Sequence, residues 1–145
     1  MRTAGLVLAS VLLSGCIGRT PHLYPTNAAA SQTGVLEAHM LGHGNLHGIL
    51  DLSLPSGEPL IGEYSIVSDG SVGFGSVFST VYGSSHGTAI GTGSAFSFPA
   101  GGQGAASLYG TNGTTLQCEF INNNMTGHGY GACQMSNGGI YRMMY

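Results

Sequence analysis

The stretch "VLEAHMLGHGNLHGILDLSL", residues 35–54, alternates between apolar or small side chains and polar ones. Successive side chains of a β-strand point to opposite faces, so a period of two predicts one buried and one wet strand face, or two strands broken at the glycines. The even positions are Leu36, Ala38, Met40, Gly42, Gly44, Leu46, Gly48, Leu50, Leu52 and Leu54, and the odd positions are mostly polar, namely Glu37, His39, His43, Asn45, His47, Asp51 and Ser53. We therefore expect an all-β protein in which the apolar positions of this stretch face a core.

After residue 54 the chain continues as short strand-like runs separated by turn signals. The turn "PSGE" (55–58) precedes a returning strand, "LIGEYSIV" (60–67). Further candidate strands are "SVGFGSVFSTVY" (71–82), "TAIGTGSAFSF" (88–98), "AASLYG" (105–110), "TTLQCEFI" (114–121), "YGACQMS" (130–136) and "IYRMMY" (140–145). The breaks between them include "PAGGQG" (99–104) and Asn-Gly pairs, which favour hairpins. About seven or eight short strands indicate a small antiparallel sandwich or barrel over residues 34–145.

The first sixteen residues have the order of a secretory signal. A single positive charge at Arg2 is followed by an apolar run that is too short to span a bilayer and then by small residues. The motif Leu13-Ser14-Gly15-Cys16 resembles the lipobox of bacterial lipoproteins. The resemblance implies that residues 1–15 are a cleaved signal peptide and that a lipid is attached to the Cys16 sulfur. Because Ile17, and not an aspartate, follows this cysteine, the family analogy favours sorting to the outer membrane, with the face left open.

Residues 17–33, "IGRTPHLYPTNAAASQT", contain two prolines among small polar residues and show no sustained period. Such a composition is typical of a spacer. We therefore expect residues 16–33 to form a lipidated tether that joins the membrane anchor to the folded domain.

The three cysteines of the chain leave a pair once Cys16 is assigned to the lipid. Cys118 and Cys133 flank the turn-rich stretch "NNNMTGHG" (122–129), and a hairpin centred there would bring them opposite each other. A disulfide closing this loop would stabilise the domain by about 3 kcal/mol in the chain-entropy model. The alternative, two free buried thiols or a redox pair, has no CxxC-like motif behind it.

Charged residues make up only 6% of the chain, and lysine is absent. After Cys16 the only cations are Arg19 and Arg142, against six acidic residues, which leaves a net charge of −4 with neutral histidines. A phosphate-binding groove needs clustered Lys or Arg. We therefore expect no nucleic-acid partner; the expected partners are the membrane, through the lipid anchor at Cys16, and a protein of the cell envelope.

His39, His43 and His47 recur every four residues and are the candidate metal ligands. On one strand, successive histidines of this set stand about 13 Å apart at ~3.3 Å per residue, too far to share one zinc ion. A hairpin folded at residues 42–44 would still bring His39 near His47, so metal binding stays open beside the simpler interpretation of solvent-facing histidines.

Catalytic signatures are missing from the sequence: there is no GxSxG elbow, no HExxH helix and no P-loop. A carboxylate pair for glycoside cleavage could come from Asp51, Glu58, Glu63, Asp69 and Glu119. Asp51, Glu58 and Asp69 lie in or beside predicted strand ends and turns, where solvated carboxylates are ordinary. We expect a non-enzymatic protein without a cofactor.

The remaining class is an accessory or binding module of the envelope. Residues 116–145 are similar to the endings of small, uncharacterised bacterial envelope lipoproteins. "SNGGIY" (136–141) is similar to the serine-glycine loop of membrane-bound lysozyme inhibitors, which are lipidated, disulfide-bearing small barrels. This second resemblance implies an alternative function, inhibition of a cell-wall hydrolase, although the chain lacks lysine and a second disulfide. The candidate binding surface comprises Asn123, His128, Tyr130, Ser136 and Tyr141.

Overall fold

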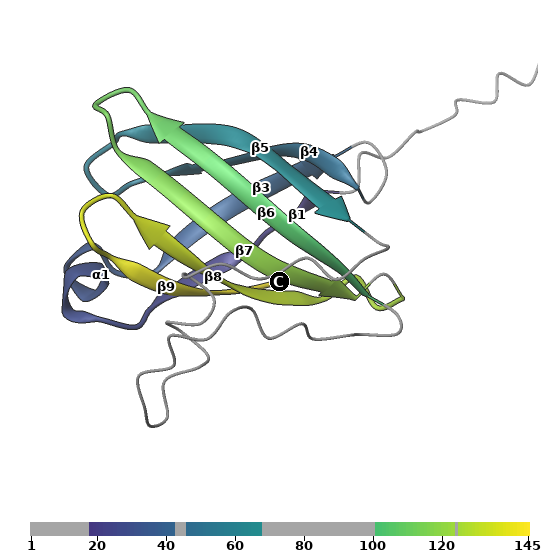
Figure 1. Ribbon diagram of the computed structural model, residues 1–145. Coiled ribbons are helices and arrows are strands. Elements are labelled where there is room, and N and C mark those ends of the chain that lie inside the picture. Colours follow the sequence, from purple (N-terminus) through teal and green to yellow (C-terminus); the bar gives the residue numbers. More distant parts are fainter. Residues whose placement is uncertain (1–17, 43–45, 68–100, 124) are drawn as a thin grey trace, which may run out of the picture.

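The computed structural model describes residues 18–42, 46–67, 101–123 and 125–145 (Figure 1). These residues form one antiparallel sheet that closes into a barrel of eight strands with one short additional strand. The elements are β1 (Gly18–Arg19), β2 (His22–Pro25), α1 (Ala28–Thr33), β3 (Leu36–Gly42), β4 (His47–Ser53), β5 (Pro59–Val67), β6 (Gly101–Gly110), β7 (Thr115–Asn123), β8 (Gly129–Met135) and β9 (Ile140–Met144). The expected all-β class is confirmed.

Each strand from β2 to β9 pairs with the next one along the chain, and β2 pairs with β9 to close the barrel. β1 continues β2 in the same register against β3, since Gly18 lies opposite Leu41 and His22 opposite Glu37. Pro21, between them, has no N–H to donate, but its carbonyl accepts a hydrogen bond of 2.9 Å from the Ala38 N–H. Closure leaves these strands without the unpaired edges at which other chains could add.

The interior of the barrel is filled by the apolar positions of the alternating pattern. Leu36, Ala38, Met40, Leu50 and Leu52 are each at most 2% exposed, as the period of two predicts. Leu46, expected to face the core as well, is 49% exposed because it lies in the connection between β3 and β4 and not in a strand. Strands from the rest of the chain supply the other core residues: Leu23, Leu60, Leu108, Leu116, Phe120, Tyr141 and Met143. The barrel is therefore held together by a packed core.

The predicted disulfide is confirmed. Cys118 on β7 lies directly opposite Cys133 on β8, with a Cα–Cα distance of 4.0 Å, and the two sulfurs are bonded. Both side chains are buried in the core, at 2% and 0% exposure. The bond therefore links two neighbouring strands from inside the barrel.

The expectation of a tether over residues 16–33 is wrong for residues 18–33, the part of it that the structure describes. These residues form β1, β2 and α1, with Leu23 1% exposed in the core. The helix begins after Asn27, whose side-chain oxygen accepts from the Ala30 N–H, and Ala30 is fully buried. β2 is too short to show a period of its own, and its partner β9 lies more than a hundred residues away in the chain.

The glycines of "PAGGQG" (99–104) are the second difference, because β6 already begins at Gly101. A Cβ at Gly104 would overlap the Phe120 ring, and one at Gly102 would overlap the Ile66 side chain. These glycines therefore make room for core side chains inside a strand and do not form the expected turn.

The candidate strands at 71–82 and 88–98, and the lipobox cysteine, lie outside the described residues. Within the described part of the chain, no helix has the length and apolar character needed to cross a membrane.

The barrel has two distinct ends. We call the end that carries Gly18, the β3–β4 connection, the β7–β8 turn and Tyr145 the amino-terminal end. The turn end carries α1 and the turns that join β4 to β5, β6 to β7 and β8 to β9 (Figure 1).

Candidate functional site

A polar cluster lies inside the amino-terminal end of the barrel. Arg19 lies opposite the inward-facing Met40, so its side chain enters the barrel. Its Nη1 donates a hydrogen bond of 2.9 Å to Asn122 Oδ1, and its guanidinium carbon lies 5.7 Å from the centre of the Tyr145 ring. The Tyr145 hydroxyl donates to the same Asn122 oxygen at 3.4 Å. Asn122, which is fully buried, thus joins the first described strand to the C-terminal residue.

Burial raises the pKa of the Tyr145 phenol strongly, and the nearby positive charge of Arg19 only partly opposes this shift. Burial also raises the pKa of Tyr64, again against the charge of Arg19. Both phenols therefore stay neutral at physiological pH and act as hydrogen-bonding groups. The cluster is suited to fastening β1 to the end of β7 and to Tyr145.

Sequence reasoning missed this cluster, although one signal was present. Along β7 the inward positions are Leu116, Cys118, Phe120 and Asn122, so an amide occupies a place where the pattern calls for an apolar residue. A buried amide needs a hydrogen-bonding partner, which Arg19 supplies from 103 residues away.

His22 on β2, His39 on β3 and His47 on β4 lie on the outer wall of the barrel. His39 Nδ1 is 3.2 Å from Asp51 Oδ1, and His39 Nε2 is 4.0 Å from Glu37 Oε1. Glu37 also reaches His22, with 3.7 Å between Oε2 and Nε2. All four side chains are more than one-third exposed, so each contact contributes little to stability.

The hairpin does not bring the candidate metal ligands together. His39 lies opposite Asp51, whereas His47 is four residues away on β4 and lies opposite Ser65 of β5, so the two histidines are about 13 Å apart along the strands. His43 lies outside the described residues. Among residues that the structure describes, no three His, Cys, Asp or Glu side chains are placed to hold a metal ion.

The candidate binding residues fall at opposite ends of the barrel. Asn123, His128 and Tyr130 lie at the β7–β8 turn, where Asn123 Oδ1 accepts from the N–H groups of residues 125 and 126 at 2.9 and 3.1 Å. His128 Nδ1 is 3.3 Å from the Tyr145 carbonyl oxygen. Ser136 lies at the turn end, where its Oγ accepts from the Thr115 N–H at 3.1 Å.

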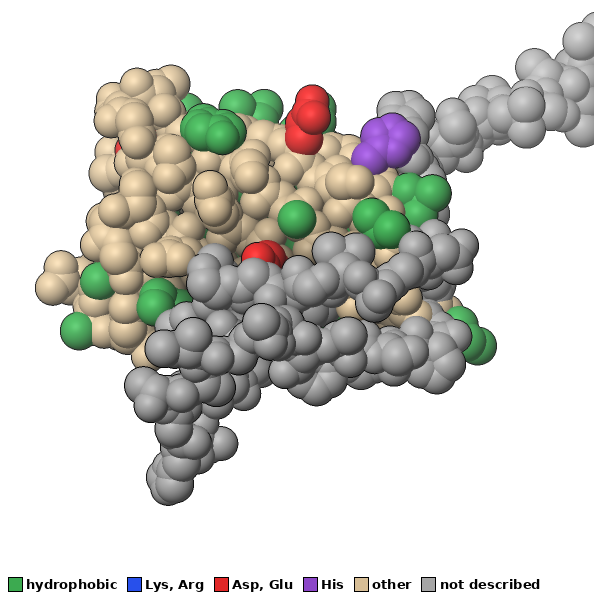
Figure 2. Space-filling model, viewed as in Figure 1, with side chains coloured by type: hydrophobic (Ala, Val, Ile, Leu, Met, Phe, Trp, Pro, Cys, Tyr) green, Lys and Arg blue, Asp and Glu red, His purple; other side chains and the backbone are tan. Residues whose placement is uncertain are grey.

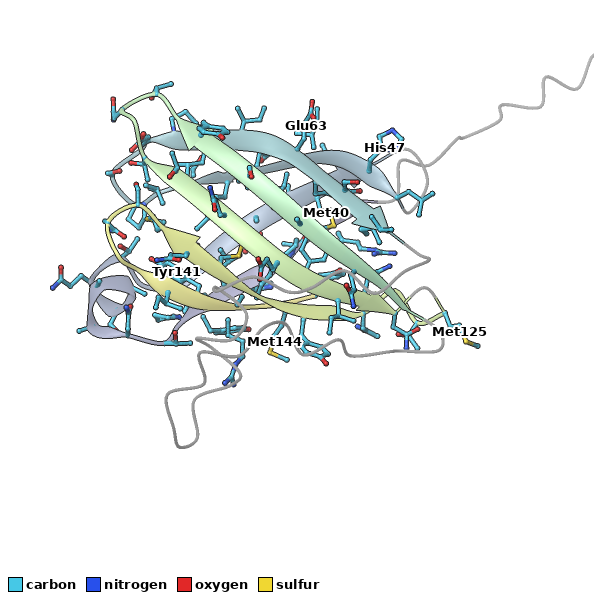
Figure 3. The ribbon with its side chains drawn as sticks, in the orientation of Figure 1. Met40, His47, Glu63, Met125, Tyr141 and Met144 are labelled. Carbon is cyan, nitrogen blue, oxygen red and sulfur yellow. A yellow bond between two sulfur atoms is a disulfide. The ribbon has the colours of Figure 1, made fainter. Side chains whose placement is uncertain are left out.

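Tyr141 is not a surface residue, so the expectation that it belongs to a binding surface is wrong. It is 0% exposed, lies opposite the inward-facing Cys133, and is seen between the strands in Figure 3. The alternation along β9 explains this, because Tyr141 and Met143 share the inner face while Arg142 and Met144 point outward. The two binding groups of the sequence analysis therefore do not form one surface.

Glu58, considered as a catalytic carboxylate, ties the β6–β7 turn to the start of β5. Its Oε2 accepts from the Thr114 hydroxyl and its Oε1 from the Asn112 N–H, both at 2.7 Å. The hydrogen bond from Thr114, helped by the backbone N–H groups of residues 112 and 114, holds the pKa of Glu58 below its usual value against the opposing effect of burial. Since both of its oxygens accept hydrogen bonds from residues 112 and 114, the Glu58 carboxylate stabilises the β6–β7 turn.

A shallow depression of about 360 Å³ lies on the outer wall between β5 and β6. Ala105 and Ser107 give it a floor of small side chains, while Glu63 lies opposite Ser107 and Tyr109 is the next outward residue along β6. Glu63 projects from the wall in Figure 3, and charged side chains are sparse on the described part of this face in Figure 2. With one carboxylate and one aromatic ring around an open floor, the depression offers little enclosure to a small ligand.

A more extensive exposed group occupies the outer wall of β8, β9 and β2. Tyr130, Met144 and His22 lie side by side in register, and Arg142 and Tyr24 lie side by side in the adjoining row. The His22 and Tyr24 rings are stacked with their centres 6.2 Å apart. Tyr24, Tyr130 and Met144 are 38–49% exposed. We call these five residues the β8–β9–β2 face.

Comparisons with known proteins gave no match. No family model, no curated protein and no solved structure is similar to this chain. The assignment of function therefore rests on the arrangement of the described residues and on the lipobox-like motif at residues 13–16.

Proposed function

We propose that this protein is a non-enzymatic, lipid-anchored component of the bacterial outer membrane that binds an envelope protein through the β8–β9–β2 face. The anchor is proposed from the lipobox-like motif ending at Cys16. The binding role is proposed from the exposed side chains Tyr24, Tyr130, Arg142 and Met144 on one face.

The composition of this face is the observation that carries the proposal. Tyrosine, methionine and arginine are enriched in protein interfaces, whereas lysine, glutamate and aspartate are depleted there. The five residues of the face include those enriched types, and the carboxylate of Glu37 lies at the β2 edge, with its Oε2 3.7 Å from His22 Nε2. Because the barrel interior is filled, an outer wall is where such a protein would meet a partner.

The hydrolase-inhibitor alternative is supported less well. Its loop, residues 136–141, ends in Tyr141, which is buried in the core and cannot reach into an enzyme cleft. Only the turn residues of that loop are exposed. The β8–β9–β2 face therefore supports the envelope-binding role better.

Photo-crosslinking in the native envelope tests the proposal. A photoreactive residue replaces Met144 on the face, and the matched control replaces Ile61, which is 59% exposed on the opposite wall of the barrel. We expect one protein to be captured from position 144 and not from 61. Added native protein without the photoreactive residue should reduce this capture by competing for the partner. An Arg142→Ala/Tyr130→Ala variant should not reduce it.

Equal capture from both positions, or capture that the double variant competes for as well as the native protein, would contradict the binding role. The anchor is tested separately by the mass of the mature protein, which should carry acyl chains that the Cys16→Ser variant lacks.

A further inference from the structure

The distance between the proposed anchor and the barrel is very short. β1 begins at Gly18, two residues after Cys16, so at most about 7 Å of extended chain separates their Cα atoms. The residues that would have formed a long spacer are strands of the barrel instead. A lipid on Cys16 would therefore hold the amino-terminal end of the barrel close to the membrane surface.

That same end presents exposed apolar side chains. Leu41, directly opposite Gly18, is 47% exposed, and Leu46, Val67 and Met125 are 49%, 47% and 84% exposed. Figure 3 places Met125 and His47 at this end, and Figure 2 shows apolar side chains near the histidine there. We call Leu41, Leu46, Val67 and Met125 the apolar rim.

The charge distribution agrees with a lipid surface as the occupant. Anionic lipids repel carboxylates, and the described acidic residues lie on the barrel wall or at the turn end: Glu37, Asp51, Glu58, Glu63 and Glu119. None of them belongs to the described residues of this end, which are 18–19, 41–42, 46–47, 66–67, 101–102, 122–123, 125–129 and 145.

We propose that the apolar rim rests in the headgroup region of the bilayer, with the barrel standing on its amino-terminal end and the turn end directed away from the membrane. This inference rests on the proposed lipid anchor. A covalent anchor keeps the rim at a high effective concentration next to the lipid, so weak apolar contacts suffice to fix the orientation. The β8–β9–β2 face then stands upright, open to a partner in the same membrane.

Depth-dependent fluorescence tests this orientation in the lipidated full-length protein. With Cys16 acylated and Cys118 bonded to Cys133, an introduced cysteine is the only free thiol of the chain. An environment-sensitive dye is attached to Leu46→Cys or Met125→Cys at the rim. The matched controls are Ile61→Cys on the wall and Ser56→Cys at the turn end, and all are placed in phosphatidylethanolamine–phosphatidylglycerol vesicles.

At both rim positions we expect the dye emission to shift to the blue and to be quenched by spin-labelled lipid. At the two control positions we expect neither change. Vesicle-bound, acylated protein whose rim dyes are unquenched, or quenched no more than the controls, would overturn the orientation and leave the anchor intact. Protein without acyl mass that stays in the supernatant would overturn the anchor, and the orientation with it.

Discussion

At the scale of single residues, Asn122 shows how one polar side chain within the core can serve the whole barrel. Its amide oxygen accepts hydrogen bonds from Arg19 and from Tyr145 while its side chain is completely buried. A charged donor that loses its acceptor in such a place costs more free energy than an ordinary hydrogen bond contributes.

We therefore expect Asn122→Leu to lower the free energy of unfolding by about 2 kcal/mol, because the Arg19 guanidinium loses an acceptor inside the barrel. Urea denaturation measures this loss, with Gln117→Leu on the outer face of β7 as the control. The double variant Arg19→Met/Asn122→Leu should recover part of the stability. Additive losses in this double variant would count against the proposed coupling.

Tyr141 gives the opposite prediction. Its hydroxyl is buried and has no hydrogen-bonding partner among the described residues. Burial takes that hydroxyl out of water, and no hydrogen bond from a described residue replaces the lost hydration. Tyr141→Phe should therefore leave the free energy of unfolding unchanged or raise it by up to about 1 kcal/mol. A thermal or urea denaturation curve shifted clearly toward lower stability would show that the hydroxyl has a partner after all.

At the scale of elements, Glu58 makes the β6–β7 turn sensitive to pH. Its pKa in the folded protein lies below the ordinary 4.5, so its stabilising contribution is present above that pH and is lost as the pH falls through the lowered pKa. Glu58→Gln should remove this part of the acid-dependent loss of stability. Unfolding free energies measured from neutral pH to below 4.5 test this, with Glu63→Gln on the barrel wall as the control.

The disulfide stabilises the hairpin formed by β7 and β8. Its cysteines are 15 residues apart, and closing a loop of that size contributes about 3 kcal/mol in the chain-entropy model. We expect Cys118→Ala/Cys133→Ala to lower the free energy of unfolding by that amount, and reduction of the native protein to have a similar effect. A double variant as stable as the oxidised protein would show that the strand pairing alone suffices.

At the scale of the whole molecule, the barrel depends on β2, which completes the ring between β3 and β9. Leu23 is 1% exposed in the core, whereas its neighbour Tyr24 points outward and is 44% exposed. Leu23→Ala should therefore lower the free energy of unfolding by about 2–5 kcal/mol, the range for large-to-small substitutions in a core. Tyr24→Ala should change the free energy of unfolding little. If both substitutions have equally small effects, residues 22–25 are not a structural strand of the barrel.

Local pattern accounts for much of the fold. Within β3 and β4 the period of two predicts which side chains face the core, because successive side chains of a strand alternate between faces. It is wrong for Leu46, which lies between the two strands and is 49% exposed. The turn-rich stretch between Cys118 and Cys133 predicts their pairing in the same way, since a hairpin places its two arms opposite each other.

What the sequence alone determined about this protein is its strand class, the core-facing positions of β3 and β4 and its disulfide, all of which depend on neighbours within a short segment. The tertiary structure decided that residues 22–25 close the barrel, that Arg19 meets Asn122, and that His39 lies opposite Asp51 and apart from His47. The physical reason is that these contacts join strands whose register is set by the closure of the whole sheet, which no short segment encodes.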